Sequence, residues 1–106
     1  MPIDYKVEVQ PLALRDMEEI VSYVAGELKN PPAAQRLAEA LVAGMESLAH
    51  LPSRCPTHVP MRPLRHEYRK LGVGNYLVFF RVSEKEEVVT VARVLYGRSS
   101  LDSRLE

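Results

Sequence analysis

The chain has 106 residues, of which 46% are hydrophobic, a length and composition that suit one ordinary globular domain. Its 14 Lys and Arg side chains balance its 14 Asp and Glu side chains, so the formal net charge is zero. These values argue against a disordered or strongly charged chain, and no run of about 18 apolar residues predicts a membrane span. We therefore expect a single domain over residues 1–106.

Charge is distributed unevenly along the chain. Residues 1–53 hold four basic and eight acidic side chains, a net charge of −4, whereas residues 54–106 hold ten basic and six acidic ones, a net charge of +4. A basic half can face a polyanion or an acidic partner, although a chance distribution of solvated charges gives the same counts. Charge alone leaves both interpretations open.

The N-terminal residues and the cysteine content bear on the compartment. Residues 1–6 lack the basic start and apolar stretch of a secretory signal, so we expect a cytoplasmic protein. Cys55 is the only cysteine, so no internal disulfide can form, which fits a reducing compartment.

One strand and two helices are predicted in the N-terminal half. Residues 3–9 alternate apolar and polar side chains with period two, which is typical of a half-buried strand. Apolar residues then recur at three- and four-residue steps over about 12–29 and about 32–50, which predicts two amphipathic helices. Asp16 lies near the start of the first helix, where the helix dipole favours an acid. The break at Asn30-Pro31-Pro32 is short, so the helices should fold into an antiparallel hairpin.

The C-terminal half is predicted to contain a loop and then a sheet. Residues 52–66 include four prolines and are expected to form the loop. Three strands joined by short turns follow as an antiparallel meander, over 67–71, 76–82 and 88–95. The segment Ser99–Asp102 can cap a short tail helix, which we expect to add little to the core.

The predicted order of elements is therefore β-α-α-β-β-β. It indicates an α+β fold in which a helical hairpin packs on one face of a mostly antiparallel four-stranded sheet. The other face would be left partly open, and a binding surface could form there.

Four segments carry a more specific pattern. Tyr68–Val82 contains an Arg, a turn, a Tyr and an apolar strand ending in aromatic-Arg-Val, and Val88–Arg98 ends in Ala-Arg-Val-Leu-Tyr-Gly-Arg. Leu14–Ile20, followed by Tyr23, lies in the first helix, and Leu48–Pro52 ends the second. Taken in order, these segments resemble the toxins of the RelE/ParE superfamily, the poison halves of type II toxin–antitoxin pairs. The resemblance covers nearly the whole chain.

The resemblance implies one of two activities. RelE-like members cleave messenger RNA in the ribosome, whereas ParE-like members resemble inhibitors of DNA gyrase, and the fold alone does not choose between them. RNA cleavage without a metal needs a base, cations for the phosphate and an acid for the leaving oxygen. RelE supplies these groups with Lys and Arg on its sheet and with a Tyr in its tail.

The sequence carries few of those groups. Lys70 lies where RelE has one strand lysine, but Tyr68 stands where the other would be, and Leu77 replaces the arginine after the strand tyrosine. Arg98 falls near the late arginine of RelE, and the tail over 99–106 has no Tyr or His to act as an acid. Lys70 and Arg98 are therefore catalytic candidates only if the chain is RelE-like. The incomplete set favours the ParE branch.

Five residues are candidates for contact with a target or an antitoxin: Arg69, Arg81, Arg93, Tyr96 and Arg98. The first three are arginines in or beside apolar strands, where they can form a cationic patch or simply pair with acids across the sheet. Tyr96 and Arg98 end the last strand, and we expect this rim to carry the function.

Other candidate sites have weaker support. His50, His58 and His66 do not combine with Cys55 in the paired spacing of a zinc site, so we expect no metal and no cofactor. Gly72–Asn75 joins two strands and opens no helix, so it should be a turn and not a phosphate-binding loop.

Together these features predict a ParE-like toxin of a type II toxin–antitoxin system, which binds gyrase and stalls it on cleaved DNA with no chemistry of its own. The alternatives are a RelE-like ribosome-dependent mRNA endonuclease and a non-toxic relative that only binds an antitoxin. The expected partners are a cognate ParD-like antitoxin, in a hetero-oligomeric complex, and gyrase. We expect neither membrane binding nor direct sequence-specific DNA binding by this chain.

Overall fold

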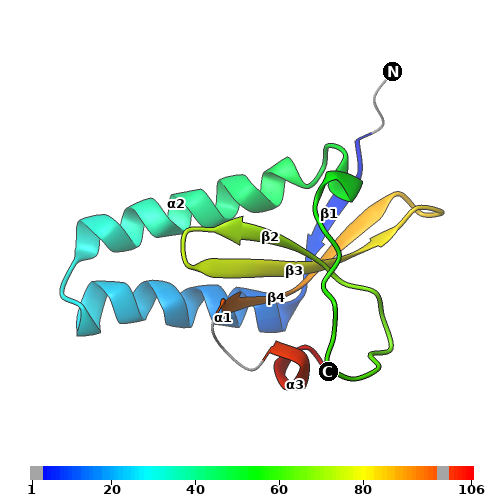
Figure 1. The fold of residues 1–106 in the computed structure, drawn as a ribbon. Helices are drawn as coiled ribbons and strands as arrows, with labels where there is room; N and C mark the ends of the chain where they lie inside the picture. The colour runs from blue at the N-terminus through cyan, green and yellow to red at the C-terminus, as the bar shows by residue number, and fades with distance from the viewer. Residues whose placement is uncertain (1–3, 98–100) are drawn as a thin grey trace.

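The computed structural model describes residues 4–97 and 101–106. Four strands form one sheet in the order β1-β4-β3-β2 (Figure 1). Their bounds are β1 Lys6–Val9, β2 Arg69–Val73, β3 Tyr76–Ser83 and β4 Val88–Tyr96. β1 runs parallel to β4 and the other neighbours are antiparallel, so the predicted mostly antiparallel sheet is confirmed.

Two helices follow β1 and fold back on each other (Figure 1). α1 Pro11–Ser22 has a proline at its first position and continues into a π-helical turn, η1 Tyr23–Glu27. α2 Pro31–Ser47 begins after Asn30, whose side-chain oxygen accepts a hydrogen bond from the Ala33 N–H at 3.2 Å. The predicted helical hairpin is confirmed. No helix in the described ranges is long and apolar enough to cross a bilayer.

The helical hairpin covers one face of the sheet. α1 packs mainly on β4, and α2 packs on β2. The close approach of α2 depends on Gly44, where an added methyl group would lie 3.1 Å from Val73 and 3.4 Å from Leu71. The core on this face is made of buried apolar side chains from both helices, the sheet and the following loop: Ala13, Leu41, Met45, Leu48, Cys55, Val78, Phe80, Val89, Val91 and Val94.

The opposite face of the sheet, which the sequence predicts to be partly open, is covered over part of its area. α3 Leu101–Leu105 and the loop before β2 enclose a second apolar cluster there. Its members are Tyr68, Phe79, Ala92, Leu95 and Leu105, with Leu64 and Leu77 packed against them. Leu105 is only 9% exposed, so the expectation that the tail adds little to the core is wrong. Alternate strand residues point to opposite faces, so β3 and β4, apolar on both faces, bury both.

β2 lies two residues later than predicted. The N–H of His58 donates to the carbonyl oxygen of Tyr68 at 2.7 Å, so the chain before β2 pairs with the loop and not with β3. At its other end β2 extends to Val73, because the turn is only Gly74-Asn75. Of these two residues only Gly74 has a positive φ, 58°, as in a type II′ hairpin turn. The predicted turn is therefore confirmed in a tighter form.

Candidate functional site

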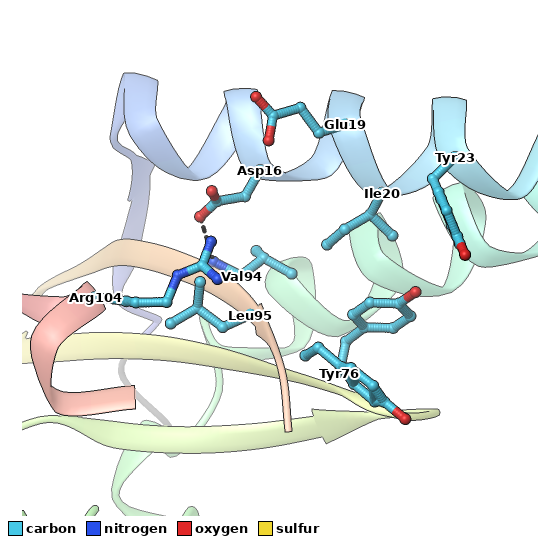
Figure 2. Close-up of a pocket in the computed structure, with 9 residues that line it drawn as sticks. Asp16, Glu19, Ile20, Tyr23, Tyr76, Val94, Leu95 and Arg104 are labelled. Carbon is cyan, nitrogen blue, oxygen red and sulfur yellow. Dashed lines mark hydrogen bonds between the residues drawn. The ribbon is translucent and has the colours of Figure 1, made fainter. Parts of the chain in front are cut away.

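A hollow of about 380 Å³ lies between α1 and the ends of β3 and β4 (Figure 2). α1 contributes a stripe of side chains spaced by three and four residues, the strands contribute their end residues, and α3 contributes one arginine. The lining residues are Asp16, Glu19, Ile20, Tyr23, Tyr76, Val94, Leu95, Tyr96 and Arg104. We call this hollow the α1–β4 groove.

Three tyrosines gather in the α1–β4 groove. Tyr76 begins β3 and Tyr96 ends β4, and the sheet register pairs them directly, with ring centroids 5.9 Å apart and planes at 44°. Tyr23 reaches the same groove from the π-helical turn, and Figure 2 shows it on the side of the groove away from Asp16. Tyr23 is 53% exposed and Tyr96 is 45% exposed. Aromatic surface is therefore available to a partner here, and Tyr is a residue type that often anchors protein interfaces.

A buried ion pair forms the other end of the α1–β4 groove. Arg93 donates from Nε and Nη2 to the two carboxylate oxygens of Asp16, at 2.7 and 2.8 Å. The Val94 N–H donates to the same carboxylate at 3.0 Å, and Arg93 Nη1 donates to the Arg104 carbonyl oxygen at 2.6 Å. The side chains of Arg93 and Asp16 are 13% and 7% exposed. We call this arrangement the Asp16–Arg93 clamp, because it joins α1, β4 and α3.

The place of the clamp follows from where β1 ends. β1 pairs with β4 only as far as Val9 opposite Val91, so β4 continues without a strand neighbour on that side. The Asp16 carboxylate takes the role of a strand partner at the Val94 N–H, which would otherwise be left unpaired. Hydrogen bonding to Asp16 is also the main cause that raises the pKa of Arg93, although burial acts in the opposite direction. The guanidinium therefore stays charged.

The structure separates the three strand arginines that the sequence suggested as a cationic patch. Arg93 pairs with an acid of α1 and not with one across the sheet. Arg69 donates from Nη1 to the Cys55 carbonyl oxygen at 2.6 Å and so holds the loop before β2. Arg81 has no hydrogen-bond or ion-pair partner among residues 4–97 and 101–106, and it borders a hollow beside Arg69 and Glu84. Of the three, Arg81 has the guanidinium most available to a partner.

Of the two predicted rim residues, Tyr96 belongs to the described part of the chain. Tyr96 lines the α1–β4 groove, and the N–H of the next residue, Gly97, donates to the Asn75 carbonyl oxygen at 3.0 Å, which fixes the end of the strand. Arg98 lies outside the described residues.

The positions that resemble a nuclease site hold few reactive groups. Lys70 is half-buried and lies opposite Phe79 in the sheet register. Leu77 packs against the second apolar cluster. Tyr68 is buried and donates its hydroxyl to Glu106 at 3.0 Å. Burial is the main cause that raises the pKa of Tyr68, and the hydrogen bond to Glu106 raises it further. This hydroxyl therefore stays protonated and hydrogen-bonded to Glu106.

Glu106 ties the tail to the loop before β2. Its carboxylate accepts hydrogen bonds from the backbone N–H groups of Arg65 and His66, at 2.6 and 3.1 Å, and from the Tyr68 hydroxyl. The Arg65 N–H is the largest cause that lowers the pKa of Glu106 below its ordinary value. The tail is thus held at Arg104 by the clamp and at Glu106 by the loop.

The histidines and the cysteine lie in separate environments. His50 Nδ1 contacts the Asp4 carboxylate at 2.8 Å on the surface, and the ring of His58 packs edge-on against Phe79 with centroids 5.4 Å apart. Cys55 is buried in the first apolar core. Within the described part of the chain, no three His, Cys, Asp or Glu side chains group so that they could hold a metal ion.

Sequence analysis missed the role of Asp16. The sequence indicates an acid that suits the helix dipole, yet Asp16 is only 6% exposed and lies on the buried stripe of α1, three residues after Ala13 and four before Ile20. An acid on the apolar stripe of an amphipathic helix signals a buried basic partner. The partner, Arg93, is 77 residues away, and periodicity within one helix cannot identify it.

One family model matches most of the chain. The family model described as the ParE toxin of the type II toxin–antitoxin system parDE matches residues 7–101. A search of the curated proteins finds no significant match.

Solved structures share the fold at low sequence identity. The chromosomal ParDE system of P. aeruginosa contains a chain that is 15% identical with a TM-score of 0.67, over 87% of this chain and 95% of that one. The RelBE2 toxin–antitoxin complex of Mycobacterium tuberculosis gives 23% identity and a TM-score of 0.62, over 89% and 92% of the two chains. The archaeal RelE–RelB complex of Pyrococcus horikoshii OT3 gives 13% identity and a TM-score of 0.59, over 91% of this chain and 99% of that one.

The family match spans both helices, the sheet and the lining of the α1–β4 groove up to Tyr96. The fold that the solved structures share is the one observed here, helices packed on a four-stranded mixed sheet. The chain therefore belongs to the family of ParE toxins of type II toxin–antitoxin systems.

Proposed function

We propose that this toxin acts on DNA gyrase by binding it, without cleaving RNA, and that a cognate antitoxin neutralises it. The proposal concerns the target and the mechanism, which family membership leaves open. In this mechanism the chain binds a macromolecule through a rigid surface and does not act as an enzyme.

The observation that carries the proposal is the apolar second face of the sheet. Leu77, where RelE has an arginine, packs into the cluster that Phe79 and Leu105 form. Tyr68, where RelE has a lysine, is buried and bonded to Glu106. Of these three positions only Lys70 carries a cation, and one lysine is a poor phosphate clamp.

The α1–β4 groove is the surface that we assign to the target. Tyr96 and Tyr23 are each about half exposed, and they come from elements that the Asp16–Arg93 clamp and the sheet hold rigidly. Tyrosine offers a large contact area with few rotatable bonds, so it loses little entropy on binding. Arg98 follows Tyr96 closely in the sequence and supplies a further candidate contact.

An antitoxin is the second partner in the proposal. The M. tuberculosis and P. horikoshii relatives were solved as toxin–antitoxin complexes. In this chain the outer side of the helical hairpin leaves large apolar residues exposed, among them Leu14 at 48% and Val42 at 45%. An amphipathic helix of an antitoxin could cover them, and a stable complex of this kind buries more than about 1,000 Å².

Two assays on the wild-type chain test the target. The chain should inhibit supercoiling by purified gyrase and leave cleaved DNA, and addition of the antitoxin should restore supercoiling. Messenger RNA should stay uncut in cells that express the chain. Cleaved mRNA with unaffected gyrase would instead establish the RelE-like alternative, and expression that slows no growth would indicate a relative that has lost toxicity.

A further inference from the structure

The Asp16–Arg93 clamp holds both ends of one segment. Asp16 accepts the hydrogen bond of the Val94 N–H near the end of β4, and Arg93 donates to the Arg104 carbonyl oxygen in α3. Residues 95–103 lie between these two anchors and include Tyr96. Because one ion pair provides both anchors, its loss should loosen both ends of the segment together, while the Gly97–Asn75 hydrogen bond and the burial of Leu105 remain.

We propose that Asp16 and Arg93 are positioning residues for toxicity, which set the place of Tyr96 and α3 relative to α1. This inference rests on the proposed function, because it takes the end of β4 as part of the surface that meets the target. The two side chains are 7% and 13% exposed, so they present little surface of their own. Their effect on a target passes through the segment that they hold.

The geometry makes the arginine hard to replace. Three guanidinium nitrogens of Arg93 each serve a different acceptor: two carboxylate oxygens of Asp16 and the carbonyl oxygen of Arg104. A lysine has one nitrogen on a flexible stem and cannot reproduce this planar fork. Arg93→Lys therefore keeps the charge while it loses the arrangement.

A complementary variant changes the acid. Asp16→Asn keeps the shape of the side chain but replaces one acceptor oxygen with an NH₂ group. That group would face a donor, either the Arg93 guanidinium or the Val94 N–H. Both variants thus weaken the clamp with little change in volume.

Three measurements on the full chain test the proposal: amide hydrogen exchange, antitoxin affinity and the expression level that arrests growth. In both variants exchange should rise selectively over residues 94–97 and 103–106, while the amides of α2 change little. The level needed for arrest should rise about ten-fold or more, since a buried charge pair is disrupted. Antitoxin affinity should change less than about three-fold if the antitoxin binds the helical hairpin.

Val89→Ala is the matched control for general destabilisation. Val89 is fully buried in β4 beside Val7 and Val82, in the part of the strand that β1 covers and away from the clamp. Its loss should raise exchange across the sheet and leave the arrest level near that of wild type.

Several results would overturn the proposal. Clamp variants that arrest growth at the wild-type level refute positioning, as does unchanged exchange near Arg104, while the proposed function stands. If the clamp variants weaken growth arrest no more than Val89→Ala does at equal stability, the clamp is purely structural. A wild-type chain that slows no growth overturns both this inference and the proposed function.

Discussion

Replacing Leu105 by alanine tests whether the tail is part of the core. Leu105 is 9% exposed and packs with Phe79, Ala92 and Leu95 on the second face of the sheet. The substitution removes three carbon atoms from this cluster, which at about 0.8 kcal/mol per methylene costs about 2.4 kcal/mol. Because the site lies near the surface and can partly collapse, we add little for a cavity and expect about 2–3 kcal/mol in total.

Urea denaturation of the full chain measures this loss directly, and thermal unfolding should show a fall in Tm of about 10–20 °C for a domain of this size. Leu12→Ala is the control, since Leu12 is 47% exposed on α1 and should cost less than about 1 kcal/mol. An equal, small effect of both substitutions would refute the second apolar cluster and the docking of α3.

Three further predictions concern the turn, the tail and the partner. Gly74→Ala should destabilise the chain by about 1–2 kcal/mol in urea denaturation. The added methyl group would meet no neighbouring atom, so the loss comes from the backbone strain of an alanine at a φ of +58°. The pKa of Glu106 lies below its ordinary 4.5, so its hold on the tail should be present above that pH and be lost as the pH falls through the lower folded-state pKa. The amide resonances of Arg65 and His66 should report this loss, and Glu106→Gln should abolish its pH dependence. Finally, the tagged chain should capture the small protein encoded next to it, and failure to bind any adjacent gene product would contradict the antitoxin partner.

The order and type of the elements could be predicted from the sequence because the signals are local. Two stretches with helical periodicity, the Asn30-Pro31-Pro32 break and the short turn at Gly74 define the hairpins without any knowledge of the rest. The ends of β2 were less predictable, because pairing with the loop at His58 depends on a contact between distant segments.

The covering of the second face shows where local reasoning stops. Phe79, Phe80 and Leu95 together make both faces of the strands apolar, which already implies cover on both sides. The sequence did not reveal that α3 supplies that cover, because a five-residue tail has too few positions to show a period. Among the described side chains of α3, Leu105 joins the buried cluster.

The candidate site was predictable only in part. Tyr96 was identified from its place at the end of a strand, and the structure sets it in the α1–β4 groove with Tyr23 and Tyr76. Those two partners come from elements that adjoin only in three dimensions. Arg93 illustrates the same limit, because an arginine in a strand suggests a surface patch or a pair across the sheet until the buried carboxylate of Asp16 is seen beside it.

The most direct test of the contact mechanism is gyrase supercoiling in the presence of wild type, Tyr96→Ala, Tyr96→Phe and Lys70→Ala. The wild type should inhibit, Tyr96→Ala should need about thirty-fold more protein, as loss of a hot spot worth about 2 kcal/mol implies, and Tyr96→Phe should retain much of the effect. Lys70→Ala should act within about two-fold of wild type, because a surface-binding toxin has no use for a single phosphate contact. If the wild type leaves gyrase unaffected, while the chain cleaves mRNA in cells and Lys70→Ala abolishes that cleavage, the account is contradicted.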